Sequence, residues 1–226
     1  MSIEPELVEK ADDALRRFDT FTRSLSPTDE ETGRFYHIVS ALSDGAKSNY
    51  IDLRGAFDRD QQVLMAWSCR NLLELAIFTK FVIGSKKNAD EFAEDRLIDG
   101  LQIGKSLKDL EAHLNPGLAT SEFDAVIEKF ATQMKAEGIT RSRFHTVKEL
   151  AGRVGMEEQY NTMNKVCSKF VHPTAWSLLT ADTGTARFPD ARDIFFVCGA
   201  EYFATVFAEI APHIRRWGLR HKPGQP

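Results

Sequence analysis

Arg70 and Glu74 are the residues whose types and spacing most clearly suit binding chemistry in this sequence. They stand four residues apart inside the run from Trp67 to Val82, whose apolar residues recur at helical spacing, so both side chains project from one helix face. A guanidinium makes paired hydrogen bonds to oxyanions such as phosphate, and a neighbouring carboxylate orients it. The alternative is an ion pair that only ties neighbouring helices together. The sequence leaves both interpretations open.

The apolar residues around this pair predict a central helix over about residues 58–84. Four of them share the face of Arg70 and Glu74 and are expected to point inward: Val63, Trp67, Ile77 and Phe81. Leu72 and Leu75 occupy the opposite side of the helix. A helix that is apolar on nearly every side must be enclosed by other elements, so we expect the rest of the chain to be arranged around it.

A second group of polar side chains lies between Tyr160 and Thr174. Its candidate ligand-binding and catalytic residues stand at helical spacings: Tyr160, Asn161, Ser168, Lys169 and His172. Pro173 disfavours helical geometry at the preceding residue, so we expect the helix to end at His172. A histidine at such a junction suits the role of general acid or base. The alternative is that His172 only caps the turn.

The sequence contains none of the common metal-binding or phosphate-loop patterns. No glutamate stands three residues before any of the 6 histidines, and neither His-Glu-x-x-His nor Gly-x-x-x-x-Gly-Lys-Ser/Thr occurs. The 3 cysteines, Cys69, Cys167 and Cys198, have no metal-ligand spacing and lie in apolar helical patterns. They predict buried free thiols in a reducing compartment, the cytoplasm, with no metal and no cofactor.

Length and composition indicate one soluble globular domain over residues 1–226, with 42% hydrophobic and 27% charged residues. The net charge of −4 argues against a general nucleic-acid coat protein, which would be basic. A basic loop at 139–145 is either solvated or in contact with phosphate; with the lysine that follows it, its charged residues are Arg141, Arg143, His145 and Lys148. No run of about 18 apolar residues occurs, so we expect no membrane partner.

Helical periodicity and end signals predict the remaining elements. Ser26 should cap a second helix that runs to about Arg54, with a break at Gly55. The full set of expected helices is 5–24, 27–54, 58–84, 89–113, 121–137, a short helix between Thr146 and Gly155, 157–171 and 190–217. Helix 5–24 and the tail 218–226 should be peripheral. Long helices joined by short turns predict an all-α fold, an antiparallel bundle of six to eight helices.

Two of these helices carry well-defined expected inner faces. In helix 89–113, the expected inner face consists of Leu97, Leu101, Gly104, Leu107 or Lys108, and Leu114. The last helix carries an aromatic-rich stripe of Phe196, Phe203, Phe207, Ile210 and Ile214. This stripe is interpreted as core, and a dimer seam is the alternative.

Two short segments also resemble a known family. The segments RNLLE at 70–74 and SKFVHP at 168–173 resemble an uncharacterised bacterial all-helical family, which is similar to the HEPN group (higher eukaryote and prokaryote nucleotide-binding domains). The resemblance covers about residues 30–215. It implies a helical bundle, a homodimer and, in many members, metal-independent ribonuclease activity.

The HEPN catalytic motif is an arginine followed after four to six residues by a histidine. Here Lys169 stands three residues before His172, and Arg215 and Arg216 precede His221 at allowed spacings. The resemblance implies a nucleotide or RNA bound by Arg70, Glu74 and His172. In an enzyme, His172 would act on a ribose 2′-hydroxyl while Arg70 held the phosphate. The alternatives are a non-catalytic interaction protein and a pocket for a small anionic metabolite.

Overall fold

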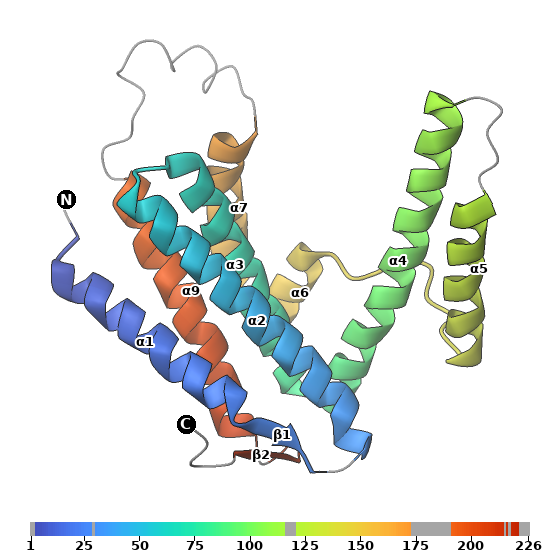
Figure 1. Ribbon diagram of the computed structural model, residues 1–226, viewed down its shortest axis with the longest axis horizontal. Coiled ribbons are helices and arrows are strands. Elements are labelled where there is room, and N and C mark those ends of the chain that lie inside the picture. Colours follow the sequence, from blue (N-terminus) through green and yellow to red (C-terminus); the bar gives the residue numbers. More distant parts are fainter. Residues whose placement is uncertain are drawn as a thin grey trace. The chain divides into compact units, whose positions relative to one another are not determined.

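Figure 1 shows the computed structural model, which describes residues 3–28, 30–115, 121–172, 191–214, 216 and 218–221. Helices account for 84% of the described residues, which confirms the predicted all-α bundle. The described residues form eight helices and one two-stranded ladder. The contacts divide the chain into a main unit, residues 1–84 with 147–226, and a hairpin unit, residues 85–146. The expectation of a single domain stays a prediction.

The main unit begins with helix α1 (Pro5–Arg23) and strand β1 (Leu25–Pro27), which pairs antiparallel with strand β2 (Leu219–His221). The prediction of Ser26 as a helix cap is therefore wrong, because Ser26 lies in β1 opposite Arg220. Pairing with the distant strand β2 holds the backbone of β1 extended. Helix signals in the local sequence do not reveal such a long-range contact.

Helix α2 (Glu30–Asp58) runs through Gly55, so the break expected there is also wrong. Ala56 and Phe57 at its last turn are 0% and 7% exposed. Their burial outweighs the helix-weakening effect of one glycine, which is worth about 1 kcal/mol. The chain turns instead at Asp60, which has a positive φ of 53°.

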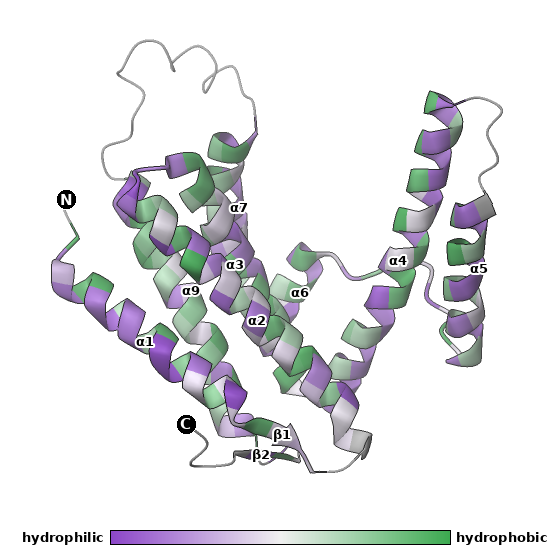
Figure 2. Ribbon diagram, viewed as in Figure 1, coloured by the Kyte–Doolittle hydropathy of each residue, from purple (hydrophilic) through white to green (hydrophobic). Residues whose placement is uncertain are grey.

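Helix α3 (Gln62–Gly84) is the central element that the sequence predicted. It packs against α2, against α9 (Ala191–His213), against α7 (Glu157–Val171) and against α6 (Val147–Arg153). Leu72, Ile77 and Phe81 are fully buried within it. Figure 2 shows hydrophobic residues concentrated on α3 and its neighbours.

The inward orientation predicted for Val63 and Trp67 is wrong, since they are 54% and 52% exposed. Val63 and Trp67 belong to the first two turns of α3. The part of the same face that another helix covers lies at the C-terminal end of α3. There the Arg153 guanidinium of α6 lies 4.4 Å from the centre of the Phe81 ring. The face is thus buried where α6 covers it and open near its start.

Helix α9 supplies the aromatic part of the core. Phe203 stacks on Tyr50 of α2 at 4.7 Å between ring centres, and Phe196 lies 4.4 Å from Phe57. Of its predicted stripe, Phe196, Phe203 and Ile210 are at most 2% exposed, so the core interpretation is confirmed. Among the described residues, α9 is the one helix long and apolar enough to cross a membrane. Its packing against α3 and α2 accounts for that composition.

Charged groups tie α1 to α2. The Asp12 carboxylate accepts hydrogen bonds from the Tyr50 hydroxyl at 3.1 Å and from Arg54 Nε at 3.2 Å. One turn of α2 earlier, Lys47 Nζ donates to Asp19 at 2.8 Å. This hydrogen bond is the main cause that lowers the pKa of Asp19, although burial opposes it.

The hairpin unit consists of α4 (Lys86–Leu114) and α5 (Ser121–Ala136), which pack against each other. The Ser85 hydroxyl caps α4 by accepting a hydrogen bond from the Asn88 amide at 3.1 Å. Two glycines of α4 let α5 approach closely: Ile127 lies 3.2 Å and Phe130 lies 2.7 Å from where a Cβ would stand at Gly104 and Gly100.

The basic loop that follows α5 is folded back onto α4. Arg141 donates hydrogen bonds to Glu94 at 2.9 Å and to Asp95 at 2.8 Å, and the His145 amide donates to Asp95 at 3.2 Å. Acidic side chains of the same unit therefore already bind Arg141. Of the expected inner face of α4, Leu97 is buried, but Leu107 and Leu114 are 45% and 63% exposed, so their inward orientation is wrong.

Replacing Gly199 of α9 with alanine should destabilise the protein by about 1–3 kcal/mol, as overpacking does. A Cβ there would stand 2.4 Å from the Leu53 side chain and 3.6 Å from the Cys69 Cα. Gly33→Ala is the control, because nothing lies within 4 Å of its Cβ position, and it should stabilise by about 0.5–1 kcal/mol. Urea unfolding measures both; equal effects would contradict the close approach of α9 to α3.

The Asp19–Lys47 pair predicts a pH dependence. A carboxyl whose pKa is lower in the folded state adds stability above its unfolded pKa and loses it as the pH falls through the folded value. Asp19→Asn should therefore lower the free energy of unfolding at pH 7 by up to about 1 kcal/mol, and the deficit should shrink below about pH 4. Asp44→Asn is the control, since Asp44 also pairs with Lys47 but is 72% exposed. A deficit that persists unchanged in acid would refute the pair's role.

Candidate functional site

Arg70 and Glu74 project from the outward side of α3 in the main unit. The Arg70 Nε donates a hydrogen bond to the Glu74 carboxylate at 3.1 Å, and the two side chains are 27% and 22% exposed. They are half-buried because Cys69 and Leu73, on the neighbouring positions of the helix, turn fully into the core. The pair is therefore neither an isolated surface contact nor a fully desolvated ion pair.

Helix α7 brings Tyr160 to this pair. Tyr160 is half-buried, and burial is the main cause that raises the pKa of its phenol. The negative charge of Glu74 raises this pKa further, while the positive charge of Arg70 lowers it. Tyr160 thus stays a neutral hydroxyl that both donates and accepts hydrogen bonds. We call these three residues, Arg70, Glu74 and Tyr160, the Arg70 site.

Asn164 adds an unused acceptor one helical turn beyond Tyr160. Its side-chain oxygen is buried and has no hydrogen-bond partner among the described residues. A spacing of four residues places it on the same side of α7 as Tyr160. A buried polar atom without a partner costs about 1–3 kcal/mol. On the other side of α3, Asn71 donates to Asn49 of α2 at 2.9 Å.

Two cysteines lie next to the site and were not assigned to it from the sequence. Cys69 and Cys167 are both fully buried, on α3 and α7, and all three cysteines are free. A hydrogen bond from Cys69 is the main cause that lowers the pKa of Cys167, and the charge of Arg70 lowers it too. The position of Cys69 next to Arg70 in the sequence was the signal that could have linked these cysteines to the site. Within the described residues, no group of three or more potential ligands is arranged for a metal ion.

The other predicted site residues are spread along α7. His172 is the C-terminal cap with φ −95° and ψ 141°, so the helix ends where Pro173 predicts. Asn161, Lys169 and His172 are exposed and Ser168 is half-buried. At 1.5 Å per residue, His172 lies about 18 Å along the axis from Tyr160. No contact between His172 and the Arg70 site is recorded in the described part of the chain, and its role stays a prediction.

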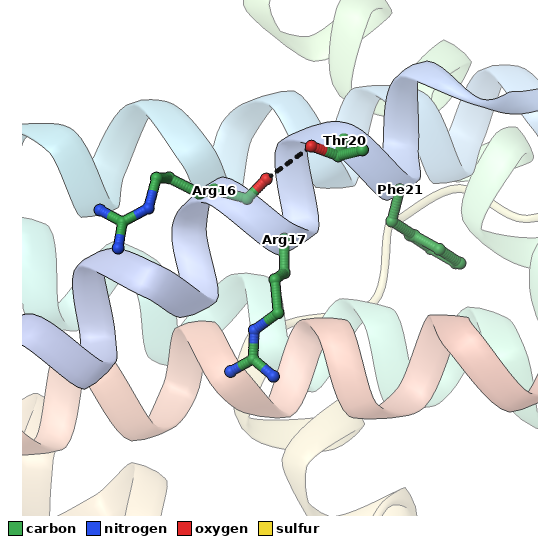
Figure 3. Close-up of a pocket in the computed structure, with 4 residues that line it drawn as sticks. All are labelled: Arg16, Arg17, Thr20 and Phe21. Carbon is green, nitrogen blue, oxygen red and sulfur yellow. Dashed lines mark hydrogen bonds between the residues drawn. The ribbon is translucent and has the colours of Figure 1, made fainter. Parts of the chain in front are cut away.

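Three residues named in the sequence analysis, Pro173, Thr174 and Arg215, lie outside the described residues. A different arginine-lined feature does lie within them. A shallow depression of about 290 Å³ lies on α1. Figure 3 shows the four residues that line it: Arg16, Arg17, Thr20 and Phe21. Both arginines already pair with Asp13, at 3.4 Å and 3.0 Å, and are 65% and 67% exposed. Nothing was assigned to this depression from the sequence, and Arg17 serves below as the control for Arg70.

Removing one member of the ion pair should reveal its half-buried character. Arg70→Ala leaves Glu74 unpaired and should lower the free energy of unfolding by about 1–2 kcal/mol, between the values for exposed and buried pairs. Arg70→Ala/Glu74→Ala should cost less than the sum of the two single variants. Denaturant unfolding of the four proteins closes the cycle; full additivity would show that the two side chains do not interact.

Comparison with known proteins identifies the family of this chain. No curated protein and no solved structure matches it. One family model, described as a family of unknown function (DUF5677), matches residues 46–185. This range contains the Arg70 site, Asn164 and His172, whereas the depression on α1 lies before it. Because the match covers more than half of the 226 residues, the chain belongs to the DUF5677 family, a family of unknown function.

Proposed function

We propose that the Arg70 site binds the phosphate group of a nucleotide or of RNA. One observation carries this proposal: Glu74 holds Arg70 through Nε, and no other hydrogen bond to the guanidinium is recorded in the described residues. With respect to the described residues, its two terminal nitrogens are thus free to donate paired hydrogen bonds, from a half-buried position where such bonds are stronger than in water. Glu74 fixes the direction in which the guanidinium points.

Trp67 favours a ligand that carries a base. It precedes Arg70 by three residues, so it lies on the same side of α3, and its indole is 52% exposed. Bases stack on exposed aromatic rings with about 1–3 kcal/mol per base. A ligand with a phosphate on Arg70 and a base on Trp67 would contact both residues. A small anionic metabolite without a ring would use only Arg70.

The catalytic version of the proposal adds His172 and draws on the resemblance to HEPN proteins. A general base must lie within hydrogen-bond reach of the ribose 2′-hydroxyl beside the phosphate, whereas His172 lies about 18 Å along α7 from Tyr160, so we propose no catalytic step. We propose binding as the primary function, because binding needs only the residues that α3 and α7 bring together. The free thiols of Cys69 and Cys167 favour a reducing compartment such as the cytoplasm.

Calorimetric titration with a nucleoside triphosphate, a single-stranded oligoribonucleotide and inorganic phosphate tests this function. Arg70→Gln should weaken binding of all three by about tenfold or more, and Arg70→Lys should also weaken it, because an ammonium lacks the planar fork. Trp67→Ala should weaken binding of the nucleotide and the RNA but not of phosphate. His172→Ala should weaken RNA binding with folding intact if the site extends along α7.

Arg17→Gln is the matched control. It removes the same charge from the depression on α1, at a position that is 67% exposed. Binding should remain within about twofold of wild type, since long-range effects of exposed charges are screened by salt. The proposal fails if wild-type protein binds none of the three ligands, or if Arg17→Gln weakens binding as much as Arg70→Gln.

A further inference from the structure

Helix α4 of the hairpin unit carries an exposed hydrophobic stripe. Its four members are 45–63% exposed: Ile103, Leu107, Leu110 and Leu114. They follow one another at spacings of four, three and four residues, so they project within a narrow sector of the helix. Such spacing is that of a coiled-coil seam, in which every member meets a partner helix. Figure 2 shows hydrophobic residues recurring along this half of α4.

The stripe lies beside the contact with α5, not within it. α5 packs over Gly100 and Gly104, and at about 100° per residue the centre of the stripe is rotated by about 70° from the midpoint between them, with Leu107 nearest to Gly100. Val126 of α5 extends the stripe: it is 44% exposed and its side chain lies 3.9 Å from the Cβ position of Gly104. The charged contact between Lys108 and Asp124, at 2.5 Å, marks the opposite side of the hairpin.

We call the exposed set the hairpin face: Ile103, Leu107, Leu110, Leu114 and Val126. A contiguous apolar patch of a few hundred Å² is the scale that marks an interaction surface on a soluble protein. Two helices alone cannot enclose such a face, because a unit of this size has too little interior. The hairpin face therefore has the character of half of a helical interface.

Both chain connections of the hairpin contact α4 before the start of the stripe. The chain enters at Lys86, and the loop after α5 is fixed by Arg141 to Glu94 and Asp95. The loop after α5 also reaches Gln102, whose side-chain amide donates a hydrogen bond to the Ser142 carbonyl at 3.3 Å. At 1.5 Å per residue, the stripe begins about 12 Å beyond Asp95 and ends about 29 Å beyond it. The hairpin face lies on the half of the unit that points away from its own connections.

We propose that the hairpin face is the docking surface for a second copy of this chain, with the two α4 helices antiparallel. The spacing four, three, four reads the same in both directions. A two-fold axis between Leu107 and Leu110 therefore places Leu107 against Leu110 of the second copy and Ile103 against its Leu114. Every exposed apolar residue of the stripe then meets another, as an isologous interface requires.

Charge along the seam is compatible with this pairing. Counting outward from the same axis, Ser106 stands opposite Glu111 of the second copy, and Gly104 stands opposite its His113. No two like charges face each other across the stripe. Two copies would pair through a single helix seam, which is small among specific protein interfaces. We therefore expect the fraction of dimer to depend on protein concentration.

Sedimentation of the full-length protein over a range of concentrations tests this surface. Wild type should pass from monomer to dimer, and Leu107→Glu/Leu110→Glu should remain monomeric, with unchanged helix content by circular dichroism. The matched control is Ile51→Glu, which places the same charge at a 57% exposed apolar position of α2 and should still dimerise. A monomeric wild type up to millimolar concentration overturns the proposal, as does a dimer that only Ile51→Glu dissociates.

Cross-linking tests the antiparallel pairing. Protein with Ile103→Cys mixed with protein with Leu114→Cys should form a disulfide-linked heterodimer under mild oxidation with a copper complex as oxidant. Each variant alone should form no more cross-linked dimer than wild type, because identical positions lie about 16 Å apart along the axis. Efficient cross-linking of either variant by itself requires a parallel or different pairing and overturns the proposal.

Discussion

Burial of α3 is the constraint on which the main unit depends. Ile77, Phe81 and the residues around them are apolar on almost every side of the helix, and no single neighbour can cover them all. α2, α9, α7 and α6 each cover one part. Gly199 of α9 has no side chain at the tightest of these contacts, and the aromatic rings of α9 fill the space toward α2.

The candidate site follows from the part of α3 that this enclosure leaves uncovered. α6 covers the Phe81 end, while the Trp67 end stays open, and Arg70 and Glu74 lie between them. Half-burial gives a guanidinium weaker competition from water without the cost of full desolvation. Tyr160 and Asn164 then supply neutral polar groups from α7. A binding function and a structural function are not exclusive here, because the same ion pair orients Arg70 and links it to its helix.

Sequence reasoning succeeded where the signal was local and periodic. Helix 157–171 was placed at its observed bounds, since Pro173 and the apolar spacing both act within a few residues. It failed where contacts between distant segments determine the structure. Ser26 pairs with Arg220, and Trp67 stays exposed because the helix that covers the Phe81 end of this face does not reach Trp67. Leu114 was placed inside because an apolar stripe looks the same whether it faces its own core or a separate molecule. Periodicity identifies faces, and it does not identify what covers them.

The Nε–Hε resonance of Arg70, followed by NMR during titration with a nucleotide, tests the central claim most directly. This group already donates to Glu74, so binding of phosphate to the same guanidinium must change its chemical shift. We predict a saturable shift at Arg70 and at the backbone amides of Tyr160 and Asn164, with Arg17 unaffected. An unchanged Arg70 resonance at saturating nucleotide, or shifts confined to Arg17 on α1, would contradict it.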